Sequence, residues 1–241
     1  MISNKDIIAD MHTHTIASGH AYGTIREMAQ GAAEKGLKLL GITEHSPSMQ
    51  GTVEDIYYCN LHLVPKKLYG VELLFGSEIN VLQDGTLDMP DNVLDNQIDY
   101  GIVGIHSCCY KDAGREQNTD NLISCMKHPR IKFVSHPDDD HTPLNYERLV
   151  QAAKEYHVAL EVNNSSFLKP EYRWNCVENY RTMLSLCRQY EAPIIVDSDA
   201  HDPSWVGCFE EAQKLLTEID FPEELVLNRS VAEVKKFIAK A

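Results

Sequence analysis

Short apolar segments alternate along this chain with longer amphipathic ones, and the alternation predicts the fold. Seven segments are apolar on both faces, as strands covered on both sides by helices are. They are residues 7–11, 37–42, 72–75, 100–105, 131–135, 159–162 and 193–196. Strands separated by helices favour a parallel sheet. Seven such units in 241 residues predict an α/β fold of one domain, residues 1–241, with a closed or nearly closed barrel.

Helical signals fall between the predicted strands. Thr24 and Glu27 have the spacing of a capping box, as do Ser230 and Glu233. Gly36 stands where the first helix should end. Segment 54–67 has a helical pattern interrupted by His62 and Pro65. The predicted helices are residues 28–34, 54–67, 91–97, 118–126, 145–156, 175–190, 208–216 and a last one from residue 230 to the C-terminus.

Side chains that bind metals recur at or just after the ends of these strands. They are His12, His14, Glu44, His45, Glu78, His106, His136, Asp199 and His201. The carboxyl ends of the strands of a parallel barrel meet at one rim, so these side chains should lie together. Imidazole and carboxylate without thiolate suit a hydrolytic Zn, Mn or Fe centre. The set is too large for one ion, and residues 163–165 add only polar neighbours after the sixth strand.

The spacing of His12 and His14 points both rings to one side of an extended segment, where Asp10 is placed to orient a ring. Four other histidines do not follow strand ends. His62, His128 and His157 lie on or beside predicted helices and are expected to be surface or packing residues. His141 lies in loop 137–143, for which we expect a solvated loop, with a position near substrate as the alternative.

Composition excludes several classes of protein. The formal net charge of −14 disfavours a nucleic-acid coat or a binder of anionic membranes, because both rely on basic patches. No apolar run is long enough for a membrane span, and the first six residues lack the layout of a signal peptide. The seven cysteines include no Cys-x-x-Cys pair, so reduced thiols in a cytoplasmic protein are expected.

The order of the motifs resembles the PHP (polymerase and histidinol phosphatase) superfamily over about residues 7–205. It is most similar to the stand-alone YcdX-type phosphatases. The resemblance rests on residues 10–14, 41–45, 76–78, 104–106, 135–138 and 197–201, and on His20 in residues 18–22. It implies a distorted seven-stranded barrel, similar to a TIM barrel.

The resemblance also implies a trinuclear metal site with Glu78 and Asp199 in bridging or positioning roles. One ion would be held by His12, His14, Glu78 and Asp199, a second by Glu78, His106 and His136, and a third by His20, His45 and His201. A hydroxide held between two ions would attack phosphorus in line. Zn is the expected metal, with Mn or Fe as alternatives. Three divalent ions (+6) with Glu78 and Asp199 (−2) would give a local charge of about +4 in an acidic protein.

The residues around this ligand shell are less determined. Asp10, Glu44 and Arg115 are expected outside it, supporting ligands or contacting substrate. The basic residues to inspect near the rim are Arg26, Lys111, Arg115, Lys169 and Arg173. Pocket walls are expected among Tyr22, Tyr110 and residues 167–174, with core or loop packing equally open.

The leading functional hypothesis is a phosphatase that hydrolyses small phosphomonoesters, with a phosphorylated metabolite as its partner. A histidinol-phosphate phosphatase is the second. A nuclease or phosphodiesterase is disfavoured because no basic tract could hold a nucleic-acid strand. A metal-bearing ligand sensor without turnover is the non-enzymatic alternative, and a homo-oligomer is left open.

Overall fold

Seven parallel strands within residues 6–239 form one curved sheet whose strand order follows the chain. The computed structural model describes these residues, so residues 1–5, on which the signal-peptide prediction largely rests, lie outside it. The strands are β1 (Ala9–Asp10), β2 (Leu39–His45), β4 (Val71–Asn80), β5 (Tyr100–Gly104), β6 (Ile131–Val134), β7 (Ala159–Asn163) and β8 (Ile194–Asp197). The predicted α/β architecture with a nearly closed seven-stranded barrel is confirmed.

The first and last strands close the barrel without a continuous ladder between them. At the carboxyl ends, Thr13 and Ala200 form an isolated parallel bridge. Farther down, the buried side chain of Asn228 fills the gap. Its amide nitrogen donates to the carbonyl of Ala9 at 2.9 Å and to that of Val196, whose N–H donates to Asn228 Oδ1 at 3.2 Å. An asparagine thus takes the place of strand backbone, and the barrel is distorted there.

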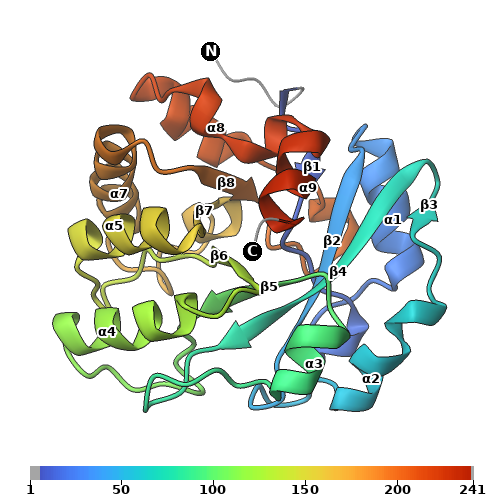
Figure 1. Cartoon of the computed structure of the whole chain (residues 1–241). Coiled ribbons are helices and arrows are strands. Elements are labelled where there is room, and N and C mark those ends of the chain that lie inside the picture. The colour runs from blue at the N-terminus through green and yellow to red at the C-terminus, as the bar shows by residue number, and fades with distance from the viewer. Residues whose placement is uncertain (1–5, 240–241) are drawn as a thin grey trace.

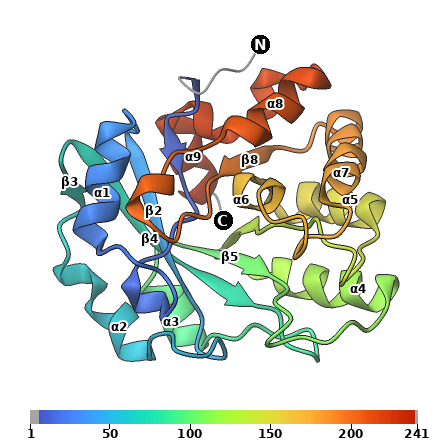
Figure 2. The same ribbon diagram turned by 180° about the vertical axis from the view of Figure 1, so that it is seen from behind.

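Helices cover the outside of the sheet. They are α1 (Ile25–Glu34), α2 (Asp55–Asn60), α3 (Asp91–Asn96), α4 (Arg115–Met126), α5 (Tyr146–Tyr156), α6 (Asn164–Phe167), α7 (Cys176–Tyr190), α8 (Glu210–Glu218) and α9 (Val231–Ala239). Helices α4, α5 and α7 stack along one side, and α1, α2 and α3 lie on the other (Figure 1). The short helix α6, visible in the view from behind (Figure 2), begins at the residue after the end of β7. The capping box of Thr24 and Glu27 forms both of its hydrogen bonds at the start of α1.

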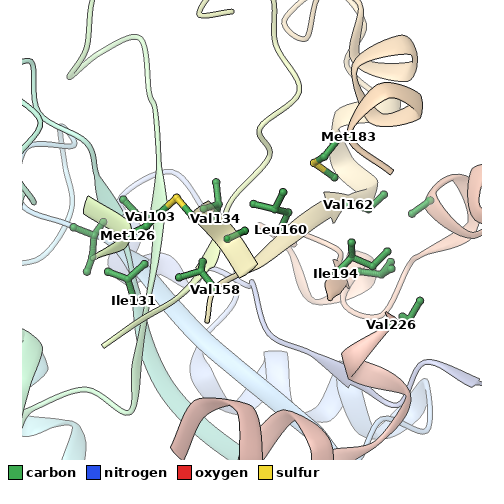
Figure 3. Packing of buried hydrophobic residues seen from close by; sticks show 14 of the residues in the cluster. Val103, Met126, Ile131, Val134, Val158, Leu160, Val162, Met183, Ile194 and Val226 are labelled. Atoms are coloured by element: carbon green, nitrogen blue, oxygen red, sulfur yellow. The ribbon is translucent and has the colours of Figure 1, made fainter. Parts of the chain in front are cut away.

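The layer between sheet and helices is apolar. Val134 and Leu160 from neighbouring strands lie close to Met126 of α4 and Met183 of α7 in one buried cluster (Figure 3). Continuous burial on both faces explains why these strands read as apolar runs rather than alternating ones.

The prediction of a helix over residues 54–67 is wrong. Helix α2 ends at Asn60, a 3-10 turn follows (Leu61–Leu63), and β3 (Lys67–Leu68) pairs antiparallel with β4. Pro65 lacks the N–H that a continued helix would need, which accounts for the break. Strand β4 also extends five residues beyond its predicted end at residue 75, so Glu78 lies within the strand.

The amino-terminal end of the barrel interior is filled by hydrocarbon and covered by α9. Its cluster consists of Ala9, Met11, Leu39, Tyr100, Ile102, Phe133, Ala159 and Ile195, with Val234 and Phe237 from α9. The rings of Phe133 and Phe237 stack with centroids 6.1 Å apart. No helix in residues 6–239 is long and apolar enough to span a membrane. All seven cysteines are free.

Candidate metal centre

The opposite end of the barrel interior gathers the predicted ligands around one carboxylate, that of Glu78. Both of its oxygens face imidazole nitrogens. Oε1 lies 2.8 Å from His136 Nε2 and 3.1 Å from His106 Nε2. Oε2 lies 3.0 Å from His45 Nδ1, 3.2 Å from His12 Nε2 and 3.4 Å from His14 Nε2. Five rings from four separate strand ends therefore meet at this side chain.

Asp199 is the second carboxylate of the cluster. Its Oδ1 lies 3.3 Å from His14 Nε2, 3.6 Å from His12 Nε2 and 3.4 Å from His201 Nδ1. His20 joins from the first loop, with its Nε2 3.1 Å from Nε2 of His201. Asp199 adopts a φ of 52° and His136 a φ of 31°, a region that side-chain-bearing residues rarely occupy. Such strain is found where a side chain must be aimed at a functional site.

The arrangement of the donor atoms fits divalent metal ions. The Nε2 atoms of His12 and His14 lie 3.0 Å apart, a separation at which these two nitrogens share at most one proton. His45 Nδ1 is buried and, although Glu78 Oε2 lies 3.0 Å away, it makes no hydrogen bond of acceptable geometry among the described residues. Three sets of ligand atoms lie within 4.8 Å of one another: His12, His14 and Asp199; His45, Glu78 and His106; and His14, His45 and His201. Cations would satisfy atoms that hydrogen bonds leave unpaired.

The electrostatics divide the rings into two groups. Burial lowers the pKa of His12, but the carboxylates of Glu161, Glu78 and Asp199 outweigh it and raise that pKa well above the usual value. Burial, reinforced by the charge of His14, lowers the pKa of His45 to about 3 and that of His201 to about 4. These two rings are neutral at pH 7, the form that binds metals.

The two carboxylates of the cluster are ionised. Burial alone would raise the pKa of Glu78, but the neighbouring imidazoles, above all the charge of His12, hold it well below its usual value. Asp199 likewise has a pKa held well below its usual value despite burial, chiefly by the charge of His12. The cluster thus offers anionic oxygens to a cation.

Glu161, which the sequence analysis missed, orients two of the ligands. It lies on the inner face of β7 and is 1% exposed. Its Oε1 is 2.7 Å from His12 Nδ1, and its Oε2 accepts from the backbone N–H of His136 at 2.6 Å. An acid within an otherwise apolar strand (residues 159–162) was the available signal. Carboxylates that hold the far nitrogen of a ligating ring fix its tautomer and direction.

Asn80 performs the same task for His106 and was also missed. Its Oδ1 lies 2.8 Å from His106 Nδ1, and its amide donates to Ser46 and Asp88 at 2.8 and 2.7 Å. Asn80 stands two residues after Glu78 on one strand and therefore on the same face. That spacing was the available signal.

Glu44 lies outside the cluster. It accepts from the hydroxyls of Thr15 and Ser18 at 2.6 and 2.5 Å, and Ser18 Oγ lies 3.1 Å from His14 Nδ1. Asp10 has a role other than the predicted one of orienting a ligand ring. It accepts hydrogen bonds from Ser198 and from the N–H of Gly207, and the acid that contacts a ring in this region is Glu161.

A glycine leaves room for the rings. A Cβ on Gly104 would lie 2.1 Å from Ser135 Oγ and 3.3 Å from the rings of both His106 and His136. Any larger residue at the end of β5 would displace these ligands.

Of the five basic residues expected near the rim, Arg173 contacts the cluster, with one guanidinium nitrogen 3.1 Å from His136 Nδ1 and 3.5 Å from Asp138 Oδ1. Arg115 is exposed at the first position of α4. Arg26, Lys111 and Lys169 are exposed as well, and Lys169 lines the pocket that Asp199 and His201 also line.

The other predicted pocket residues and the remaining histidines also differ in whether they lie beside the cluster. Tyr110 is buried and hydrogen-bonds Asn121, as packing predicts, whereas Tyr22 lines a pocket beside the cluster. His157 stacks on Phe237 at 4.0 Å, and His141 is exposed against Trp174 at 4.3 Å. His62 is exposed and His128 partly buried, both away from the cluster.

Comparison with known proteins gives one consistent family. Residues 10–219 match the PHP domain. A probable phosphatase of Caldanaerobacter subterraneus subsp. tengcongensis is 40% identical over 96% of this chain and 91% of its own length. One of Acetivibrio thermocellus is 38% identical over 97% and 95%.

Two solved structures share the fold. Histidinol phosphate phosphatase of Lactococcus lactis, complexed with zinc, L-histidinol and phosphate, has a TM-score of 0.60 at 16% identity, covering 90% of this chain and 95% of that one. A chain in archaeal ribonuclease P with mature tRNA has a TM-score of 0.62 at 13% identity, covering 95% and 89%.

Proposed function

Since the chain belongs to the PHP domain family, we propose that it is a metal-dependent phosphatase that hydrolyses phosphomonoesters of small molecules at three divalent ions. The observation that carries the proposal is the meeting of five imidazole nitrogens within 3.4 Å of the two oxygens of Glu78. A carboxylate shared by that many rings suits a bridge between ions rather than a structural ion pair.

We assign the ligands to the three ions as the motifs indicate. His12, His14, Glu78 and Asp199 would hold the first ion, Glu78, His106 and His136 the second, and His20, His45 and His201 the third. Distances of 3.3 Å between His14 and Asp199, 2.8 Å between His136 and Glu78 and 3.1 Å between His20 and His201 support the grouping. His45 Nδ1 lies 3.0 Å from the shared carboxylate of Glu78. Zinc is the first choice because the ligands are imidazole and carboxylate, and Mn or Fe suit the same donors.

The bound ions would supply a water of lowered pKa and withdraw charge from the phosphoryl oxygens. The protein's own groups prepare for this. Glu161 and Asn80 fix the rings of His12 and His106, and Glu44 fixes His14 through Ser18. Arg173 places a guanidinium beside His136, where it would meet a phosphate oxygen.

Histidinol phosphate is the second candidate substrate, favoured by the shared fold with the Lactococcus lactis enzyme. The 38–40% identity to probable phosphatases over nearly the whole chain favours a broader phosphomonoesterase. A panel of phosphorylated metabolites separates the two. Exclusive turnover of histidinol phosphate would replace our assignment with the second candidate.

The test is elemental analysis of protein purified without added metal, followed by a phosphate-release assay on Zn-, Mn- and Fe-loaded protein. We expect three ions per chain and hydrolysis of a generic aryl phosphate, with no cleavage of single-stranded DNA. His106→Ala should abolish hydrolysis while leaving the circular dichroism spectrum unchanged, and His62→Ala, an exposed histidine, is the matched control. Loaded protein that hydrolyses no phosphoester at all would favour the sensor without turnover.

A further inference from the structure

A pocket of about 480 Å³ opens directly beside the metal cluster. Two cluster residues, Asp199 and His201, form part of its wall. Lys169 and Asp202 add one charge of each sign, while most of the exposed lining surface is apolar and includes Tyr22, Leu168 and Trp205. These three side chains are 77%, 48% and 53% exposed, so they keep large apolar surfaces uncovered at the mouth of the site. Exposed aromatic surface around a concave site marks a place where a ligand binds.

We propose that this pocket receives the leaving group, and that the enzyme selects phosphomonoesters whose leaving group carries a flat aromatic ring. This inference rests on the proposed function, because it assumes that phosphate binds at the cluster. Aromatic side chains such as Tyr22 and Trp205 bind planar rings through apolar contact and through offset or edge-to-face stacking. The volume lies within the range of pockets that enclose a small organic ligand.

One wall of the pocket is attached to the metal cluster itself. Asn163 donates to Asp199 Oδ2 at 3.2 Å and to Glu161 Oε2 at 3.1 Å, and its Oδ1 caps α6 by accepting from Ser166 N. Helix α6 carries the chain to Leu168. The apolar wall is therefore positioned by the same hydrogen bonds that position a ligand carboxylate.

A second wall of the pocket, the segment that carries Trp205, is held in place by Asp10. This buried carboxylate accepts from Ser198 N at 3.1 Å and from Gly207 N at 2.9 Å, and so holds both ends of the segment that carries Trp205. The middle of the segment packs on α1, where a Cβ on Gly31 would lie 2.5 Å from the carbonyl oxygen of Pro203. A wall held this tightly is preorganised, which lowers the entropic cost of binding a ring.

The position of the pocket matches the direction in which a leaving group would depart. Two candidate ligands line the pocket: Asp199, assigned to the first ion, and His201, assigned to the third. A phosphate held over the Glu78 end of the cluster would thus direct its ester oxygen toward His201 and the attached group into the pocket.

The binding test avoids differences in leaving-group reactivity by using phosphonates, which are not hydrolysed. Benzylphosphonate and propylphosphonate are titrated into metal-loaded protein carrying Trp174→Phe, which leaves Trp205 as the only tryptophan because the chain has two. We expect benzylphosphonate to change the Trp205 fluorescence and to bind about tenfold more tightly than propylphosphonate. Equal affinities would overturn the inference.

Variants supply the second readout. Trp205→Ala and Tyr22→Ala should each lower kcat/KM for phenyl phosphate about tenfold, mostly through KM, and change kcat/KM for glycerol phosphate less than twofold. The matched controls are Trp174→Ala and Tyr172→Ala, whose side chains are 58% and 70% exposed but do not line the pocket. Losses of the same size for both substrates would contradict the inference.

The outcomes separate the two proposals. No hydrolysis of either substrate by the metal-loaded wild-type protein would defeat the proposed function itself. Hydrolysis of both with no selective effect of Trp205→Ala would defeat the inference alone. A nucleoside 5′-monophosphate as a third substrate tells whether the ring is attached to the ester oxygen directly or through a sugar.

Discussion

The two ends of the barrel interior are built by the same strands and the same strand face, yet they have opposite chemistry. On β7, Ala159 belongs to the apolar cluster, and Glu161, two residues on, holds a metal-ligand candidate. On β8, Ile195 belongs to the apolar cluster, Asp197 follows it, and Asp199 faces the imidazoles. The change from hydrocarbon to charge takes two residues, the repeat of a strand.

The difference shows how the fold supports a cluster that is costly by itself. Burial raises the pKa of Asp197 well above its usual value, and the nearby charges of Glu161 and Asp10 add to the shift. Gathering acids in this way destabilises the folded state. The apolar end, which α9 covers with Val234 and Phe237, offsets that cost without contacting the ligands. One end therefore supplies stability, and the other is free to be arranged for chemistry.

The largest effect is expected at the charged end. Glu78→Gln removes the negative charge of the carboxylate that we propose as the bridge between ions, so kcat/KM should fall at least about a thousandfold and the metal content should drop. Glu72→Gln, on the same strand but half-buried and paired with Lys235 instead of the imidazoles, is the control and should leave both unchanged. Phosphate release and elemental analysis measure the two quantities. Full metal content in Glu78→Gln would show that the carboxylate is not a bridge.

The next largest effect is expected at the apolar end, where a substitution should change only the free energy of unfolding. Phe133→Ala leaves a cavity beside Phe237 and should lower the free energy of unfolding by about 3–5 kcal/mol. Urea denaturation measures this, and metal content well below the melting temperature should stay at the wild-type value. If the variant lost metal below its melting temperature, the stability supplied by the apolar end and the metal binding at the charged end would not be independent.

A smaller effect is expected at the boundary between the ends. Glu161→Gln keeps the shape but removes the charge that holds His12, so metal affinity should fall about 10–100-fold. Competition against chelators of graded strength measures the affinity. Glu155→Gln, an exposed acid on α5, serves as the control. Unchanged affinity in Glu161→Gln would mean that packing alone orients the ring.

The smallest expected effect is the release of protons when the metal binds. The pKa of His12 is raised well above 6.5 and that of His14 is raised, so the apoprotein binds protons on these rings that a metal must displace. Loading Zn²⁺ at pH 7 should release them, as calorimetry in buffers of different ionisation enthalpy measures. His45, with its pKa lowered to about 3, should contribute none.

The same shift makes the apoprotein's stability depend on pH. A raised folded-state pKa contributes stability below the unfolded value near 6.5, and that contribution is lost as the pH rises through the folded value. A melting temperature of the apoprotein that rises with pH across this range would contradict the assignment.

The sequence predicts the rim of the barrel well because a single rule places it. Strand ends of a parallel barrel meet, so His106 and His136 could be assigned to one region without knowing any contact. His20 could not, because it lies in a loop whose path strand periodicity does not determine, and the family resemblance alone indicated it.

Contacts inside the barrel were harder to predict. Glu161 lay hidden in a segment read as an apolar strand, and whether such an acid faces the interior depends on strand register. The antiparallel β3 was missed because a two-residue strand has no periodicity to detect. The role of Asp10 could not be predicted because its hydrogen-bond donors lie in segment 198–207, near the other end of the chain.

The asparagine that fills the gap between β1 and β8 sets the boundary of the folding unit. The PHP match ends at residue 219, whereas Asn228 and α9 lie beyond it. A chain cut at residue 219 would keep every candidate ligand but leave backbone groups of Ala9 and Val196 unpaired and Phe133 open to water. A boundary drawn where the PHP domain match ends would thus cut through the folding unit.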